Sequence, residues 1–164
     1  MLLSLTGSAQ SVIREKQVPP LVLEEFAYRF QDAEHIVWKQ QGEQYYWAEF
    51  KQGNVLTQVI YHPNGRWEQT EREISYRQMP DSARAYCRLN YADYQAKMTK
   101  KVSTRRYGIL YELQIVGNQK VVEMTFDMHG KLLDEQEAEM VVESPSEKGI
   151  KGRFNKLMRR KGED

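Results

Sequence analysis

The stretch Tyr46-Trp47-Ala48-Glu49-Phe50 decides the fold, because Tyr111-Glu112-Leu113-Gln114-Ile115 repeats its pattern at an offset of 65 residues (46 to 111). The turn segment Tyr61-His62-Pro63-Asn64-Gly65-Arg66 recurs at the same offset as Phe126-Asp127-Met128-His129-Gly130-Lys131. Self-similarity in register indicates an internal repeat. We therefore predict two divergent copies of one unit, residues 18–74 and 79–142.

Each copy opens with a proline, Pro19 or Pro80, followed by apolar residues at helical spacing. Because proline favours the first turn of a helix, we predict helices over residues 20–30 and 80–91. Their apolar stripes are Val22, Phe26 and Phe30, and Ala83, Cys87 and Tyr91. Cys87 thus fills a core position as a small buried hydrophobe. The helices are offset by 61 residues (19 to 80), whereas the strand segments are offset by 65. The second copy therefore has four additional residues (65 minus 61) around 100–106, which we interpret as a surface-loop insertion.

Alternating, β-rich segments follow each helix and predict four strands per copy. They cover residues 36–39, 44–50, 55–61 and 66–74, and then 96–102, 107–116, 120–126 and 131–140. Short links with Gly and Asn turns make neighbouring strands antiparallel. The predicted fold class is α+β, with two tandem repeats, each one helix packed on a four-stranded antiparallel sheet (α-β-β-β-β). Because a unit of about 60 residues is marginal alone, we expect the repeats to share a core or a continuous sheet.

Two segments flank the repeats, which we assign to residues 18–76 and 77–143. Residues 1–17 hold an apolar run that ends in Gly7-Ser8-Ala9, a pattern typical of the end of an export signal. This pattern predicts a periplasmic or secreted protein; the alternative is an accidental resemblance.

The other flanking segment, residues 144–164, is a basic tail. From 145 to 164 it holds seven Lys or Arg against three acids, so the net charge of +1 leaves residues 1–144 at about −3 by subtraction. Phe154, Leu157 and Met158 allow a short amphipathic helix that contacts an anionic membrane or a polyanion. The alternative is a frayed, solubilising terminus.

The strands separate into two faces. Tyr46, Ala48 and Phe50 match apolar residues in the second copy and should lie under the helix. The opposite face carries aromatic and apolar side chains, and such a patch usually marks a contact surface. The candidate binding residues are Tyr45, Trp47, Leu56, Ile60 and Trp67. In the alternative interpretation these residues only pack, either between the repeats or under the carboxyl-terminal segment.

The chain offers little for catalysis or metal binding. His35, His62 and His129 show no ligand spacing, and Asp127 alone does not supply the six to eight oxygens of a calcium site. Acids such as Glu71 are interpreted as residues that aid solubility and protect strand edges. We predict no enzyme activity, no metal and no cofactor. The net charge near zero gives no reason to expect a nucleic-acid partner.

The order of these motifs resembles the PepSY-like proteins. The matching segments include Val18-Pro19, Val37-Trp38, Asn64-Gly65-Arg66-Trp67, Met79-Pro80 and Phe126-Asp127-Met128-His129-Gly130-Lys131-Leu132-Leu133. The resemblance spans about residues 17–142 and implies exported α+β repeats, common in Bacteroidetes, with a fold similar to the β-lactamase inhibitor protein. In that inhibitor the open sheet face grips the target enzyme, which corresponds here to the face of Tyr45 and Trp47. His62-Pro63-Asn64-Gly65 departs from the family's Asp-x-Asp-Gly turn and weakens a calcium role.

Two functions are compatible with this sequence. The first is a non-enzymatic exported binding or inhibitory module that uses the open, aromatic-bearing sheet face to bind a protein or peptide. The alternative is an envelope-associated structural protein, held to a membrane or polyanion by its basic C-terminal tail. Membrane contact is expected only through that tail.

Overall fold

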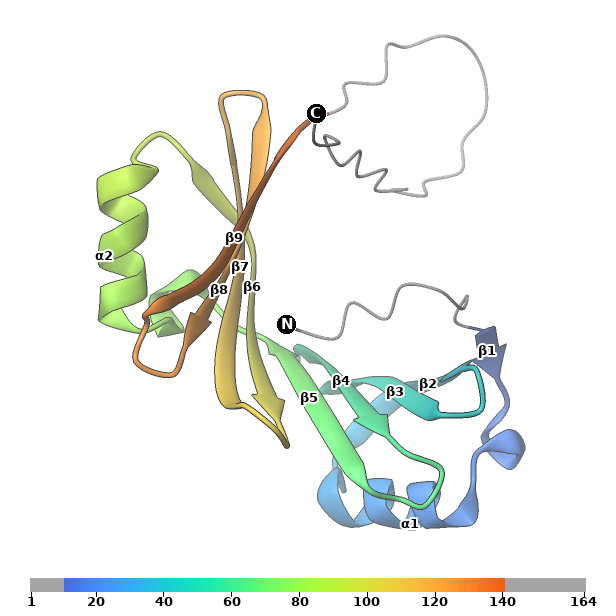
Figure 1. The fold of residues 1–164 in the computed structure, drawn as a ribbon. Coiled ribbons are helices and arrows are strands. Elements are labelled where there is room, and N and C mark those ends of the chain that lie inside the picture. The colour runs from blue at the N-terminus through green and yellow to red at the C-terminus, as the bar shows by residue number, and fades with distance from the viewer. Residues whose placement is uncertain (1–10, 141–164) are drawn as a thin grey trace, which may run out of the picture.

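The computed structural model describes residues 11–140, shown in colour in Figure 1. Its strands are β1 (Ser11–Ile13), β2 (Ala33–Gln41), β3 (Tyr45–Gln52), β4 (Val55–Tyr61), β5 (Trp67–Glu73), β6 (Gln95–Thr104), β7 (Gly108–Gly117), β8 (Lys120–Asp127) and β9 (Leu132–Glu139). The helices are α1 (Pro20–Arg29) and α2 (Asp81–Asn90), each preceded by a 3-10 turn, η1 (Glu15–Gln17) or η2 (Tyr76–Gln78). Neither helix is long and apolar enough to cross a membrane. The basic tail and most of the predicted export signal lie outside the described residues.

All nine strands belong to one antiparallel sheet, in chain order from β1 to β9. The predicted fold class, α+β with two tandem repeats of a helix on its own four-stranded sheet, is therefore wrong: the fold is mostly β, with two short helices. β5 pairs with β6, from Gln69 opposite Thr104 to Glu73 opposite Lys100, and this pairing makes the sheet continuous.

The residues that make this join are the ones predicted to form a surface-loop insertion. Residues 100–104 belong to β6 and pair with β5, and only 105–107 form the turn into β7. The sequence interpretation also missed β1, which pairs with β2 through Ser11 opposite Gln40 and Ile13 opposite Trp38. A strand of three residues is too short to show the alternation on which strand prediction depends.

Each helix packs on one part of the sheet and completes a core. Phe26 of α1 lies in the first core, with its ring centroid 5.1 Å from that of Trp38 and 5.0 Å from that of Phe50. Ala83 and Cys87 of α2 lie in the second core, so the prediction that Cys87 is buried is confirmed. Burial raises the pKa of the Cys87 thiol, which disfavours the reactive thiolate.

The sheet bends steeply where β5 meets β6, and the two halves stand at an angle to each other (Figure 1). α1 lies under β2 to β5, and α2 lies beside β6 to β9, so both helices occupy the convex side of the bend. The surfaces that neither helix covers therefore turn toward one another. This bend creates a concave side of the sheet built from both halves of the chain.

Candidate binding face

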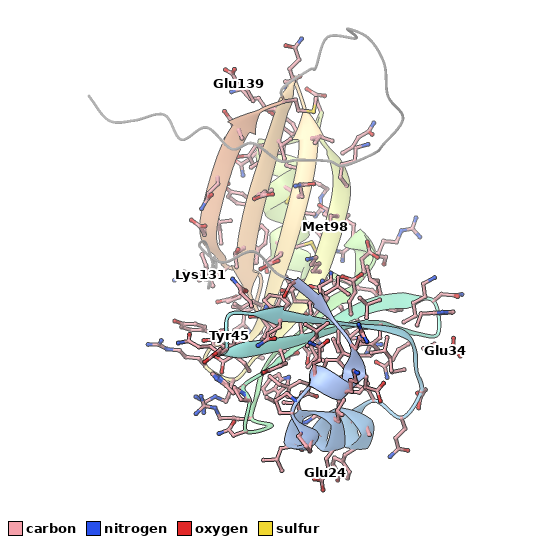
Figure 2. All side chains as sticks on the ribbon, turned by 90° about the vertical axis from the view of Figure 1, so that its right-hand side faces the viewer. Glu24, Glu34, Tyr45, Met98, Lys131 and Glu139 are labelled. Atoms are coloured by element: carbon pink, nitrogen blue, oxygen red, sulfur yellow. The ribbon has the colours of Figure 1, made fainter. Side chains whose placement is uncertain are left out.

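Alternation along each strand separates the two sides of the sheet. Tyr46, Ala48 and Phe50 are buried in the core under α1, as predicted. Residues of the opposite phase form what we call the concave face, part of which Figure 2 shows from the front. The concave face comprises Lys39, Tyr45, Trp47, Glu49, Lys51, Leu56, Gln58, Ile60, Gln69, Glu71, Glu73, Lys100, Val102, Leu110, Glu112, Gln114 and Glu123.

Four of the five residues predicted to bind a partner lie on the concave face. Trp47 stands directly opposite Ile60 in the β3–β4 ladder. Ile60 is only 5% exposed, whereas Leu56, near the β3–β4 turn, is 43% exposed. Tyr45 and Trp47 are half-buried. The accessible apolar surface of this half of the face therefore comes from Tyr45, Trp47 and Leu56.

Trp67 lies on the other side of the sheet. A register shift between β4 and β5 places Trp67 opposite Tyr61, and its ring packs against the core under α1. The Trp67 indole N–H donates a hydrogen bond to Thr70 Oγ1 at 2.8 Å, and the Arg29 guanidinium lies 5.7 Å from the ring centroid. The structure thus does not bring Trp67 together with the other four candidates.

Tyr45 lies beside a polar cluster at the β4–β5 turn. Its ring centroid is 5.0 Å from that of His62. His62 Nε2 lies 3.0 Å from Glu68 Oε2 and 3.0 Å from an Arg66 guanidinium nitrogen. These contacts hold the turn against the end of β3 and limit the movement of the Tyr45 ring.

A row of paired polar side chains crosses the first half of the concave face. Lys39 Nζ donates to Glu49 Oε2 at 2.8 Å, and the Gln58 amide donates to the same oxygen at 3.0 Å. The hydrogen bond from Lys39, followed by that from Gln58, holds the pKa of Glu49 below its usual value. Glu49 is therefore a carboxylate whose charge is satisfied within the face.

A second polar row crosses the bend. Lys100 Nζ of β6 donates to Glu71 Oε2 of β5 at 2.8 Å. Burial alone would lower the pKa of Lys100, but the hydrogen bond with Glu71 and its charge raise it above the usual value. Glu112 stands opposite Lys100 on β7, yet it makes no hydrogen bond to any residue of the described chain.

Glu112 is consequently a different kind of carboxylate from Glu49. Burial raises the pKa of Glu112 above its usual value, and the charge of Glu71 raises it further, while Lys100 offsets only part of the effect. Such a group destabilises the fold when it is ionised. A cation that approaches it from outside the face would stabilise its charged form.

The sequence interpretation missed both polar rows. Glu71 was assigned to the protection of a strand edge, but β5 lies in the middle of the sheet and Glu71 pairs with Lys100. Lys39 and Glu49, or Glu71 and Lys100, meet only through the register of neighbouring strands. Opposite charges at diagonal positions of a correctly paired ladder would have been the signal, since Lys39 faces Trp47 and Glu71 faces Val102.

Replacing Glu112 with glutamine is expected to raise the free energy of unfolding at pH 7. The raised pKa means that the folded chain binds the proton more tightly than the unfolded chain, so stability falls as pH rises above the ordinary glutamate pKa of about 4.3. Glutamine does not titrate and avoids this loss. Urea denaturation between pH 4 and pH 8 should show a gain at neutral pH that shrinks toward about pH 4.

Glu49→Gln is the matched control and should act in the opposite direction. Its lowered pKa contributes stability that is present above the unfolded pKa and is lost as pH falls through the folded pKa. The variant should therefore be less stable than the parent at pH 7, with the difference fading in acid. Changes of the same sign in both variants would contradict the assignment of two different carboxylates.

No group of three or more His, Cys, Asp or Glu side chains within residues 11–140 is arranged to hold a metal ion. His62 and His129 lie in different turns, one between β4 and β5 and the other between β8 and β9. The Asp127 carboxylate instead accepts hydrogen bonds from the backbone N–H groups of His129 and Lys131, at 2.8 and 2.9 Å. These bonds occupy Asp127 in holding its own turn.

Comparison with solved structures finds the same fold in Bacteroides proteins. A protein of Bacteroides eggerthii described as periplasmic superposes with a TM-score of 0.67 at 18% identity, covering 73% of this chain and 88% of that one. A BLIP-like protein of Bacteroides fragilis superposes with a TM-score of 0.63 at 21% identity, covering 77% of this chain and 89% of that one. A DUF2874 family protein of Bacteroides uniformis superposes with a TM-score of 0.65 at 15% identity, covering 73% of this chain and 88% of that one. These identities establish the fold alone. Among proteins with curated descriptions, none matches this chain.

At the level of families, the match is direct. Residues 44–134 fit the model of the beta-lactamase-inhibitor-like, PepSY-like proteins. This segment runs from the start of β3 into β9 and contains every residue of the concave face except Lys39. The resemblance identified from the sequence motifs is thereby confirmed. Because the matched segment spans more than half of the 164 residues, the chain belongs to the beta-lactamase-inhibitor-like, PepSY-like family.

Proposed function

We propose that this protein is an exported, non-enzymatic binding module that holds a protein or peptide partner on its concave face. The observation that carries the proposal is the bend of the sheet, which leaves one continuous surface that neither helix covers. Both cores are filled from the convex side, so the packing of the helices does not require the aromatic side chains of this face. A concave, strand-built surface fits a convex loop or domain of a partner.

The side chains of the concave face suit this role. Trp47 and Tyr45 are large, half-buried anchors, and tryptophan and tyrosine dominate the energetics of protein interfaces. The row formed by Lys39, Glu49 and Gln58 lies beside Trp47 and offers polar groups that are already ordered. Ordered polar groups around an aromatic anchor are typical of a binding site that loses little side-chain entropy on association.

Export is the second element of the proposal. Similar structures come from Bacteroides proteins described as periplasmic, and the amino-terminal residues resemble the end of an export signal. We expect the protein in the osmotic-shock fraction of the native cells, detected with an antibody against the chain. Recovery with the cytosolic fraction would contradict this part of the proposal.

A capture experiment tests the binding role. Immobilised protein, a Tyr45→Ala/Trp47→Ala double variant and a Tyr28→Ala control are exposed side by side to periplasmic extract. Tyr28 is 77% exposed on α1, on the convex side, and provides an aromatic deletion away from the concave face. A partner retained by the parent and by Tyr28→Ala, but lost by a folded double variant, is the expected result. Equal capture by all three proteins would refute the role of this face.

Replacing Trp47 with phenylalanine should preserve both stability and partner binding. The indole N–H of Trp47 is buried and has no hydrogen-bond partner among residues 11–140. Phenylalanine therefore removes a buried donor that makes no stabilising hydrogen bond there. We expect the free energy of unfolding to change by less than about 1 kcal/mol, because lost packing and a removed unsatisfied donor offset each other.

Trp47→Ala provides the contrast. Loss of the whole ring from an interface anchor should weaken partner binding by about 2 kcal/mol or more, roughly 30-fold. Calorimetric titration of the captured partner against both variants measures the difference. If Trp47→Phe weakened binding as much as Trp47→Ala, the partner would have to recognise the indole N–H, and the buried position of that group would contradict the proposed contact.

A further inference from the structure

The middle of the concave face carries more acids than bases. Its carboxylates are Glu49, Glu71, Glu73, Glu112 and Glu123, and its cations are Lys39, Lys51 and Lys100, so the carboxylates outnumber the cations by two. Lys39 and Lys100 are each already hydrogen-bonded to one carboxylate of the face, at 2.8 Å in both pairs. The face therefore has a net negative charge that its own lysines do not neutralise. A positively charged occupant would complement it.

Glu112 gives this excess a definite position. It lies between Lys100 of β6 and Thr125 of β8. Its carboxylate makes no hydrogen bond to any described residue, and the neighbouring carboxylates of Glu71 and Glu123 act on it unfavourably. A lysine or arginine placed over Glu112 would relieve this repulsion and supply the missing donor.

The chain itself contains a segment of the required charge. Residues 145–164 hold seven Lys or Arg against three acids, while the remainder of the chain is at about −3. The cations alternate with Ile150, Phe154 and Leu157, so the segment also offers apolar side chains. These are suited to the accessible aromatic surface that Trp47 contributes to the same face.

The geometry allows the segment to reach the concave face. Glu139 ends β9 at the far end of the face from the bend (Figure 2). Glu112 is two strands from β9, about 10 Å across the sheet, and five residues back along the strands, about 17 Å. Lys148 follows Met140 by eight residues, which span up to about 27 Å when extended. The first cation of the segment can therefore reach Glu112, and later ones can reach Glu71.

We propose that residues 145–164 dock on the concave face and compete there with the partner. Tethering to β9 gives the segment an effective concentration on the order of millimolar at the face, which populates even a weak electrostatic contact. The docked segment lowers the apparent affinity for any external partner, because only the open fraction of the protein is available. The competition rests on the proposed function; the docking does not.

Docking is tested on the full chain without a partner. A nitroxide label is attached to the cysteine of an Asn155→Cys variant. The native Cys87 is buried, so the introduced thiol is the one that reacts with the label. Amide signals of β5 to β8 should broaden severalfold more than those of α1 and α2. Addition of about 1 M sodium chloride, where the Debye length is about 3 Å, should abolish the difference. Absence of this pattern at low salt, or equal broadening over the helices, would overturn the proposal.

Two further samples identify the occupant and the site. The variant Glu71→Gln/Glu112→Gln/Glu123→Gln should lose the broadening, whereas Glu24→Gln, on α1 on the convex side, should keep it. A mixture of isotope-labelled chain without nitroxide and unlabelled chain with nitroxide should show no broadening. Broadening in the mixture would mean that the segment of a second copy occupies the face, which would overturn docking within one chain.

Competition is read separately from docking. A chain truncated after Val142 should bind the captured partner severalfold more tightly than the full chain at low salt, with the two affinities converging at about 1 M salt. If the nitroxide pattern appears but no partner is captured, the proposed function fails and the docking stands. If a partner binds the concave face equally well with and without the tail, the competition is refuted and the proposed function stands.

Discussion

Phe26→Ala is expected to lower the free energy of unfolding by about 3–5 kcal/mol, the usual cost of deleting a buried phenylalanine side chain. Phe26 is 5% exposed and is the aromatic residue of α1 in the first core. Its ring contacts those of Trp38 and Phe50 edge to face, with interplanar angles of 65° and 87°. Such pairs add to the area that the ring buries. Loss of this ring removes the main attachment of α1 to the sheet.

Tyr28→Ala is the control on the same helix. Tyr28 is 77% exposed, so its deletion should cost less than about 0.5 kcal/mol, as for most surface positions. Urea denaturation followed by circular dichroism gives both values. Comparable losses for the two variants would mean that α1 does not depend on the core contact of Phe26. Because the concave face lies on the other side of β3, partial unfolding caused by Phe26→Ala should also weaken partner capture.

The sequence patterns located most individual elements correctly. The predicted strand over residues 55–61 is β4, and the helices predicted to begin at Pro20 and Pro80 match α1 and α2 within about one residue. The Asn64-Gly65 turn forms as predicted, with a hydrogen bond of 3.0 Å from Gly65 N–H to His62 O. These features depend on neighbours close in sequence, which is why periodicity and turn chemistry capture them.

The errors concern contacts between residues distant in sequence. β5 and β6 are separated by η2 and α2, and no local signal indicates that Glu71 will face Val102 or that Lys100 will bind Glu71. The joined sheet, its bend and the polar row across it all follow from this one pairing. The concave face could therefore be predicted as a set of aromatic side chains on β3 and β4, but not as a surface that includes β6 and β7.

The misplacement of Trp67 has a more local cause. A β-bulge inserts one extra residue into a strand and reverses the side of every residue beyond it. Tyr61 pairs with Trp67 while Ile60 pairs with Gln69, so Glu68 is the additional residue. Simple alternation does not reveal such a bulge. Trp67 consequently belongs to the core under α1 and should affect stability rather than partner binding.

Gly130→Ala should be nearly as costly as Phe26→Ala, but for a backbone reason. Gly130 has φ +81° in the β8–β9 turn, a left-handed conformation that costs an L-residue about 1–2 kcal/mol. An added Cβ would also lie 2.7 Å from the backbone nitrogen of Ala83 and 2.9 Å from Pro80 Cβ, at the start of α2. The turn would have to separate from the helix, which adds about 1–3 kcal/mol of overpacking.

Gly53→Ala separates the two contributions to that loss. Gly53 also has a positive φ, +57°, but an added Cβ there meets no atom within 4 Å. Its replacement should cost only the backbone term of about 1–2 kcal/mol, against about 2–5 kcal/mol for Gly130→Ala. Equal losses of unfolding free energy in urea denaturation would show that the β8–β9 turn moves away from α2 without a measurable cost. A larger loss for Gly130→Ala would establish that the β8–β9 turn and the start of α2 form one rigid contact, which fixes the second half of the concave face from behind.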